Sequence, residues 1–439
     1  MNCLYLSSVS SYSGTNTYAN RMPQSLATMG QFVFYNDPLT TVILPSTIVE
    51  IGEGAFGTCT GMTSLTMINS SGTVVNNGSY YSCINNVLYY GTSSGNYSEV
   101  VGCATTANFG TTLTLESGVT SINPYALENT DKLKNIIVPS SLTSIGSTAL
   151  YSAGALVSFR FAANGSGALS IGENALQNCT SLTTMELPNR TTSIGDNAFS
   201  GDKVLANFPT TATQTTFTTG TLDMSGMSSF TSLGVGAFNG CLALKNVTLP
   251  DATGFTTLSE KAFYGCTGLT SINLGTHLTT IGTNALAGDT ALATTSIPTS
   301  VTSINASAFD GDKGLTSLTF GDGSAASIIR GTGAGTLTIN KQAFQNCTNA
   351  AFTKIVIPSN AAFVFDSTNY PFAGDTQLTI YLGCTLDNYT TANYPVGWNY
   401  KANSLSSTAL PYKLYTATSP SDTSHSYWHY NSSGVVTDW

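Results

Sequence analysis

The sequence predicts a solenoid built mainly of short β-strands, with brief helical or 3-10 turns, wound into about eleven coils of about 23 residues. A six-residue phrase recurs along the chain at a base spacing of 23 residues, and a block that alternates apolar and polar residues lies between its copies. A unit this short cannot bury its own apolar face. Neighbouring units therefore stack, and their apolar residues form one continuous core.

Composition agrees with a folded repeat array and excludes several kinds of partner. Of 439 residues, 8% are charged and 41% hydrophobic, against roughly 25% charged in typical domains. The net charge is −9, and the 14 basic residues are scattered singly, so no cluster is available to bind nucleic acid. No run of about 18 apolar residues predicts insertion into a membrane.

The repeated phrase is an apolar residue, Gly or Asn, two variable residues, and then Ala-Phe or Ala-Leu. We expect a tight turn into a short helical segment whose last two residues point into the core. The copies end at Ala55-Phe56, Ala126-Leu127, Ala149-Leu150, Ala175-Leu176, Ala198-Phe199, Ala237-Phe238, Ala262-Phe263, Ala285-Leu286, Ala308-Phe309 and Ala343-Phe344, with a degenerate copy at Pro371-Phe372.

The second block reads Leu-x-x-apolar-x-apolar and often ends in Pro, as in Leu133 to Pro139 and Leu244 to Pro250. Its alternation predicts a half-buried strand, which Pro ends because it has no N–H to donate. The outward positions form a sheet face, which is our candidate binding face; the alternative is an ordinary solvated face. These positions are Ile43, Thr66, Ile137, Arg160, Glu186, Thr248, Asn273, Ser296 and Thr319.

The two blocks together resemble the BspA-like (treponemal-type) leucine-rich repeats, and the stretch from Leu269 to Phe309 follows that unit with few departures. The resemblance covers about residues 39–384. It implies a leucine-rich-repeat solenoid, a hairpin insertion at about 80–105, and a cell-surface or extracellular protein that binds host or matrix components. Fold transfers well from such a resemblance, whereas the ligand does not.

Residues 1–38 and 385–439 lie outside the repeat and are predicted to cap its ends. Both segments are rich in aromatic residues, which predicts contacts with neighbouring subunits as well as capping. The first positive charge is Arg21, so residues 1–20 do not read as a signal peptide.

The nine cysteines fall into two main groups. Cys83 and Cys103 flank the predicted hairpin, where they form either a disulfide or two free thiols. The others with a clear place stand one per coil, three residues after the phrase, where we expect a small residue at a tight turn and Asp wherever that turn is solvated. They are Cys59, Cys179, Cys241, Cys266 and Cys347, with Asp202, Asp289, Asp312 and Asp375 in other coils.

Nothing in the sequence predicts catalysis, a cofactor or a metal. The cysteines come one per coil, whereas zinc sites need close pairs. The chain has three histidines; His425 and His429 are four residues apart, but the aromatic residues around them favour strand and turn. No Ser-His-Asp arrangement, carboxylate pair or phosphate-binding glycine loop stands out.

N-glycosylation is one explanation for how a chain with so few charges stays in solution. The alternative is that Asn-x-Ser/Thr sequons arise by chance in a chain rich in these residues. The sequons begin at Asn69, Asn77, Asn96, Asn164, Asn178, Asn189, Asn246, Asn305, Asn346, Asn388 and Asn431.

Two non-enzymatic functions follow from the sequence. The first is adhesion or protein recognition at the cell surface, with a protein or glycan ligand bound on the sheet face. The second is a structural subunit of a filament, layer or virion fibre, in which copies of the chain associate through their aromatic-rich ends.

Overall fold

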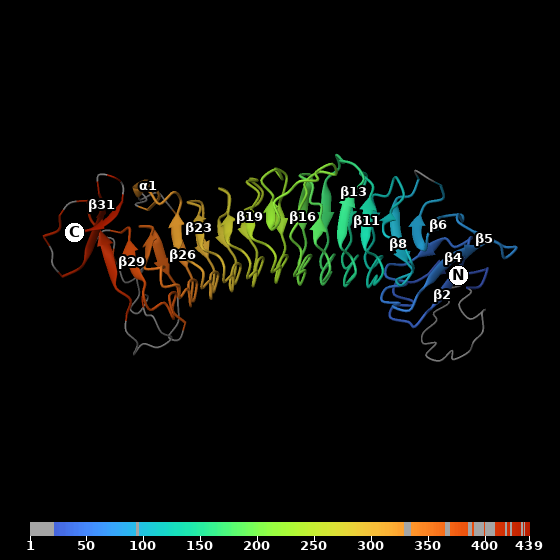
Figure 1. Cartoon of the computed structure of the whole chain (residues 1–439), viewed down its shortest axis with the longest axis horizontal. Helices are drawn as coiled ribbons and strands as arrows, with labels where there is room; N and C mark the ends of the chain where they lie inside the picture. The colour runs from blue at the N-terminus through green and yellow to red at the C-terminus, as the bar shows by residue number, and fades with distance from the viewer. Residues whose placement is uncertain are drawn as a thin grey trace. The chain divides into compact units, whose positions relative to one another are not determined.

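The computed structural model describes residues 22–93, 96–328, 335–364, 369–384, 389, 399, 409–417, 419–421, 424–431, 433 and 435–439. The chain divides into two compact units, Met1–Thr219 (unit 1) and Gly220–Trp439 (unit 2). In each unit the chain winds as a solenoid, and successive coils lay their strands side by side (Figure 1). The predicted solenoid is confirmed.

Each coil contributes strands to two parallel sheets. The first sheet uses the Leu-x-x-apolar-x-apolar block, and the second uses the residues that lead into the repeated phrase. In unit 1 the first-sheet strands are β2 (Thr41–Pro45), β4 (Ser64–Ile68), β9 (Leu113–Thr114), β11 (Asn135–Val138), β13 (Ser158–Phe161) and β15 (Thr184–Met185), with β5 (Val74–Val75) antiparallel to β4.

The second sheet of unit 1 carries the inserted hairpin. Its strands are β1 (Thr28–Met29), β3 (Glu50–Ile51), β6 (Tyr81–Ile84), β7 (Val87–Tyr90), β8 (Glu99–Cys103), β10 (Ser121–Ile122), β12 (Ser144–Ile145), β14 (Leu169–Ile171) and β16 (Thr191–Ile194). Strands β6, β7 and β8 are antiparallel neighbours, and β10 returns to parallel pairing on β8.

Unit 2 repeats the two-sheet arrangement. The first-sheet strands are β17 (Thr221–Asp223), β19 (Asn246–Thr248), β21 (Ser271–Asn273), β23 (Thr294–Ile297), β25 (Ser317–Phe320), β27 (Lys354–Ile357), β29 (Thr379–Leu382), β30 (Tyr412–Tyr415), β31 (Tyr427–Tyr430) and the antiparallel β32 (Val436–Asp438). The second-sheet strands are β18 (Ser232–Leu233), β20 (Thr257–Leu258), β22 (Thr280–Ile281), β24 (Ser303–Ile304), β26 (Leu337–Ile339) and β28 (Ala361–Phe363). A four-residue helix, α1 (Ala325–Ile328), lies between β25 and β26.

The core is built from ladders of equivalent residues, as the repeat predicts. The ring of Phe238 stacks on Phe263 at 5.5 Å between centroids, and Phe344 stacks on both Phe309 and Phe372 at 5.4 and 5.6 Å. Each ring comes from a different coil and is fully or almost fully buried. Stacking of coils therefore supplies the apolar contacts that no single coil has.

The repeated phrase forms two successive turns, so the expectation of a short helix there is wrong. The residue before each Ala has positive φ, as at Asn174 (54°) and Asn284 (54°). A second left-handed residue follows two positions after the Phe or Leu, as at Asn178 (62°) and Gly288 (80°). A right-handed helix cannot include such residues, whereas Asn and Gly tolerate them.

The array is also longer than the eleven coils predicted from the phrase. It has about 15 turns of about 23 residues, because coils without the phrase still stack. In the first described coil Phe34 takes the place of the phrase's Phe and stacks on Phe56 at 6.1 Å. At the other end β30 and β31 add parallel strands to the first sheet of unit 2.

Candidate binding face

The first sheet of unit 2 presents two rows of small polar side chains in register. Strands β17, β19, β21, β23 and β25 pair so that Thr248, Asn273, Ser296 and Thr319 are successive Cα partners, and Asp223 opens the same row. The second row is formed by Thr221, Asn246, Ser271, Thr294 and Ser317. We call these ten residues the polar face.

The polar face is accessible and almost without charge. Asp223, Asn273, Ser296, Thr294 and Ser317 are exposed, and the other five residues are half-buried between them. Asp223 is its one ionisable residue. Strands lie about 4.8 Å apart and alternate residues about 6.6 Å apart, so the rows form a regular grid of hydroxyl and amide groups. Such groups both donate and accept hydrogen bonds.

Some of these groups are held by their neighbours. The Ser271 hydroxyl donates to Oδ1 of Asn246 at 2.8 Å, and the Ser296 hydroxyl donates to the carbonyl of Gly321. Oδ1 of Asn273 accepts from the N–H of Gly275 at 3.0 Å. These bonds fix the orientation of the side chains and leave further donor and acceptor positions open.

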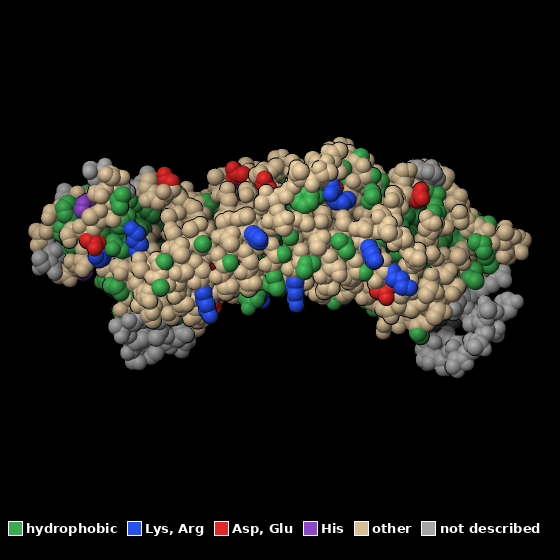
Figure 2. Space-filling model, in the orientation of Figure 1, with side chains coloured by type: hydrophobic (Ala, Val, Ile, Leu, Met, Phe, Trp, Pro, Cys, Tyr) green, Lys and Arg blue, Asp and Glu red, His purple; other side chains and the backbone are tan. Residues whose placement is uncertain are grey.

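Charged side chains are sparse on the visible surface of each unit. In the view of Figure 2, Lys, Arg, Asp and Glu cover little of the surface and occur singly or in small groups. A ligand bound to such a surface is recognised mainly by hydrogen bonds and shape, because few ion pairs are available.

In unit 1 the predicted face is less regular. Ile43 pairs with Thr66, and Ile137 pairs with Arg160, all four being partly exposed. Glu186 is different, because only 1% of it is exposed. Its prediction as an exposed binding residue is therefore wrong.

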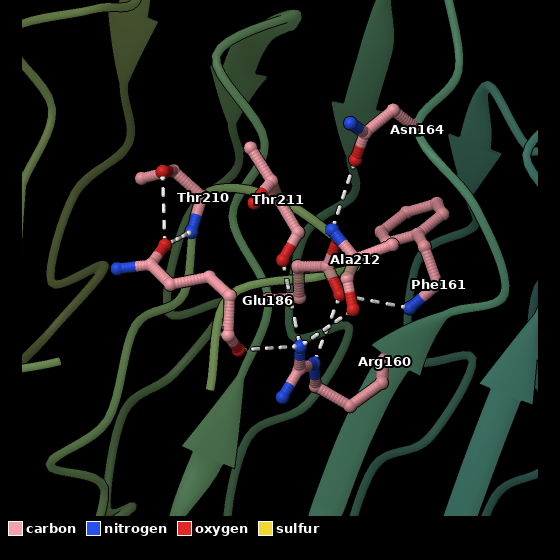
Figure 3. A network of polar contacts seen from close by, with 8 residues as sticks. Arg160, Phe161, Asn164, Glu186, Thr210, Thr211 and Ala212 are labelled. Atoms are coloured by element: carbon pink, nitrogen blue, oxygen red, sulfur yellow. Dashed lines mark hydrogen bonds and ion pairs between the residues drawn. The ribbon is translucent and has the colours of Figure 1, made fainter. Parts of the chain in front are cut away.

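Glu186 is covered by a loop, residues 209–216, which we call the strap (Figure 3). Oε2 of Glu186 accepts from Nε of Arg160 at 2.9 Å and from the N–H of Phe161 at 3.0 Å. Nη2 of Arg160 donates to the carbonyls of Ala212 and Gln214, each at 3.1 Å. The ion pair thus fixes the strap over this part of the face.

The residues three positions after the phrase form a buried ladder, which we call the inner ladder: Cys59, Cys179, Cys241, Cys266, Cys347, Asp202, Asp289, Asp312 and Asp375. The thiols of Cys59, Cys179, Cys266 and Cys347 donate to a carbonyl one coil earlier, as Cys59 does to Phe34 at 3.0 Å and Cys347 to Phe309 at 3.2 Å. The four Asp residues are at most 2% exposed, so the expectation that Asp marks a solvated turn is wrong. Burial raises the pKa of Asp375 to about 8 and holds the pKa of Asp289 well above its usual range, where the nearby Asp312 adds to the shift.

Cys83 and Cys103 do not form the disulfide that was one expectation for the hairpin. Cys83 lies on β6 and Cys103 on β8, with β7 between them, so the strands are about 9.5 Å apart. A disulfide needs Cα atoms about 4.4–6.8 Å apart. Both thiols are free and buried, and burial raises the pKa of Cys83 to about 12.

The sequons divide by accessibility. Asn77, Asn96, Asn164, Asn189 and Asn431 are exposed, whereas Asn69, Asn178, Asn246, Asn305 and Asn346 are half-buried. Asn388 lies outside the described residues. The exposed sequons remain the better candidates for glycosylation, because a transferase needs access to the side-chain amide.

The described residues contain no group of three or more His, Cys, Asp or Glu placed to hold a metal ion. His429 lies on β31, where its ring stacks on Trp439 at 3.9 Å between centroids. No helix in the described part of the chain is long and apolar enough to span a membrane.

Sequence reasoning missed the second row of the polar face, Asp223 and the strap. The rows were open to prediction, because the same two places in the strand block of each neighbouring coil give the equivalent residues. The strap carries no sequence motif, so the sequence could not predict it.

The model of the BspA type leucine rich repeat region matches in 6 copies, over residues 8–94, 106–226 and 222–330. A leucine-rich repeat protein from Eubacterium ventriosum is 25% identical, with a TM-score of 0.49 over 61% of this chain. The match spans 63% of that protein's length. A leucine rich cell surface protein from Faecalibacterium prausnitzii is 20% identical over 79% of this chain and 97% of its own, with a TM-score of 0.43.

The leucine rich repeat protein of T. pallidum is 21% identical over 45% of this chain and 81% of its own, with a TM-score of 0.34. Among curated proteins, none matches. Because the family model covers well over half of the sequence, the chain belongs to the BspA-type leucine-rich-repeat family.

Proposed function

We propose that the chain is a non-enzymatic recognition module at the cell surface, which binds a protein or glycan ligand through the polar face of unit 2. The observation that carries this proposal is the uninterrupted register of β17 to β25, which aligns ten small side chains in two rows. Repeat proteins commonly bind along such an extended surface.

The first sheet of unit 1 supports this role less well. The strap covers Glu186 there, and the sheet is interrupted between β4 and β9. The polar face of unit 2 has neither feature between β17 and β25. Since it holds one carboxylate and no cation, binding through it should change little with ionic strength.

A charge-insertion experiment tests the assignment. The full chain is screened against purified matrix proteins and a glycan array, and each ligand found is measured with the double variant Asn273→Arg, Ser296→Arg. The control is Thr267→Arg, Thr290→Arg, which adds the same charge to exposed turn residues of the same two coils. We expect at least a tenfold loss of affinity for the face variant alone. Equal affinities of the two variants would contradict the proposal.

A second function, a subunit of a surface filament, layer or virion fibre, is favoured by the end of unit 2. Val435 and Trp439 are 54% and 47% exposed beside β32, the last strand of the first sheet. This function predicts association that increases with concentration in sedimentation velocity and that Val435→Lys weakens. Val364→Lys, at a residue with 52% exposure in the same unit, is the control. A full chain that stays monomeric at millimolar concentration contradicts it.

A further inference from the structure

The first sheet of unit 1 is interrupted by a gap between β4 and β9. Strands β2, β4 and β5 form one sheet, and β9, β11, β13 and β15 form another. The coil between β4 and β9 contributes β6 and β7 to the second sheet instead. Two edges of the first sheet therefore face each other across this gap.

The edge of β4 is covered by side chains of the hairpin. Oδ1 of Asn86 accepts the N–H of Leu65 at 3.0 Å, and the Cys83 thiol donates to the carbonyl of Leu65 at 3.0 Å. Strand β5 pairs with Met67 and Ile68 further along. The hairpin thus satisfies the backbone groups that a neighbouring strand would otherwise bond.

The edge of β9 is not covered. Leu113 is in register with Ile136, and the N–H of Leu115 donates to the carbonyl of Ile137 at 2.9 Å, so these residues direct their backbone groups toward β11. The N–H and C=O groups of Thr112 and Thr114 then point to the other side, because alternate residues of a strand bond to opposite neighbours. Within the described residues these four groups have no hydrogen-bond partner.

This edge opens into a pocket of about 450 Å³. Its lining includes Asn85, Asn86, Asn108, Phe109, Thr112 and Thr114, and no charged residue lines it. Asn85 and Asn86 hold the hairpin turn with positive φ of 51° and 65°, which brings this turn to the pocket. The pocket therefore combines unpaired strand groups with side-chain amides and one aromatic ring.

We propose that the edge of β9 binds an extended, uncharged segment of a protein partner, which adds to the sheet as a strand. Alternating N–H and C=O groups two residues apart match the backbone of another strand, and main-chain bonds of this kind supply affinity in strand addition. Small polar side chains fit the amide-lined walls. A charged side chain would lose hydration there without gaining an ion pair. This site is separate from the polar face, so its failure leaves the proposed function untouched.

The test uses a phage library of random heptapeptides, selected on the full chain. Enriched peptides are synthesised and titrated against the Thr114→Pro and Thr114→Ala variants. Proline removes the N–H of residue 114, a group that takes no part in the pairing with β11, whereas alanine keeps it. We expect at least a tenfold loss of affinity with Thr114→Pro, less than a twofold change with Thr114→Ala, and slower amide hydrogen exchange of Thr112 when peptide binds.

Thr112→Trp provides a second variant that keeps every backbone group. The bulk of Trp at this exposed pocket residue should block binding of the same peptides. This variant therefore tests the proposal even if Thr114→Pro does not fold. Peptides that bind all variants equally would overturn the proposal, as would a selection that enriches none.

Discussion

The backbone N–H of Asp289 donates a hydrogen bond of 2.9 Å to Oδ1 of Asp312, the equivalent residue one coil later. Both carboxyl groups are fully buried in the inner ladder, between coils that carry Cys at the same place. Burial is the main cause that raises the pKa of each well above its usual range, and it favours the protonated acid. The fold therefore carries neutral carboxylic acids where other coils carry thiols.

This arrangement makes the protein more stable in mild acid. In the folded state the pKa of Asp289, Asp312 and Asp375 is raised above the unfolded value near 3.9. Above about pH 4 the folded state therefore binds more protons than the unfolded state does. The contribution of these acids to the free energy of unfolding is fully present below about pH 4. It is lost as pH rises toward about 8, the folded pKa of Asp375. We expect Tm to be several degrees higher at pH 4.5 than at pH 8. A Tm that rises over this interval would show that the buried acids do not control stability.

Removing the charge should abolish much of this dependence. Asp289→Asn with Asp312→Asn keeps the side-chain size, and the amide introduced at position 312 retains an oxygen that accepts from the N–H of residue 289. We expect the double variant to be about 1–3 kcal/mol more stable than the parent at pH 8 and much closer to the parent in stability at pH 4.5, measured by urea unfolding. The control is Asp322→Asn, at an exposed Asp whose pKa is lowered to about 2 by hydrogen bonds to Ser324 and Ser327. This control variant should have the same change in the free energy of unfolding between pH 5 and 8 as the parent.

The strap depends on the buried ion pair of unit 1. In Glu186→Gln the guanidinium of Arg160 remains half-buried beside three strap carbonyls but loses its counter-charge. Removing one partner of such a pair destabilises the folded state. We expect a loss of about 1–3 kcal/mol in the free energy of unfolding, because Arg160 is partly solvated. Urea unfolding measures the loss, and amide exchange in 209–216 should quicken.

Lys261→Met is the control for that variant. It removes an exposed pair with Glu260 at 3.1 Å, which should contribute less than about 1 kcal/mol. Equal effects of Glu186→Gln and Lys261→Met on the free energy of unfolding and on amide exchange in residues 209–216 would mean that the strap does not depend on the Arg160–Glu186 pair.

The left-handed turn residues limit what each coil tolerates. Asn284 has φ of 54° directly before Ala285. We expect Asn284→Val to cost about 1–2 kcal/mol, because a β-branched residue is strained there, and Asn284→Gly to cost little. The matched control is Thr283→Val at the preceding residue, which does not have positive φ. A similar Tm for both Val variants would contradict the role of this turn.

The repeat predicted the core and the sheet because both depend on spacing. The stacked Phe238 and Phe263, and the row through Thr248 and Asn273, follow from matching equivalent places in successive copies of the repeat. The turn was misjudged because Ala-Phe alone is compatible with a helix. The Gly and Asn that precede Ala at Gly236 and Asn284 were the signal for left-handed residues.

Other features depend on contacts that no local pattern carries. Asp is rarely buried, so the burial of Asp202 was not predictable from its coil alone. Glu186 has the alternation of an outward residue, but it is buried beside Arg160 and the strap. The open edge of β9 arises because the inserted hairpin pairs in the other sheet.

Photo-crosslinking tests the assignment of the binding site most directly. p-Benzoylphenylalanine is placed at Asn273, in the centre of the polar face, and in a second protein at Thr267, an exposed turn residue of the same coil. Each is irradiated with a ligand identified in the binding screen, and crosslinked mass is quantified. We expect crosslinking from position 273 and only background crosslinking from position 267. Equal crosslinking from the two positions, or crosslinking from 267 alone, would contradict it.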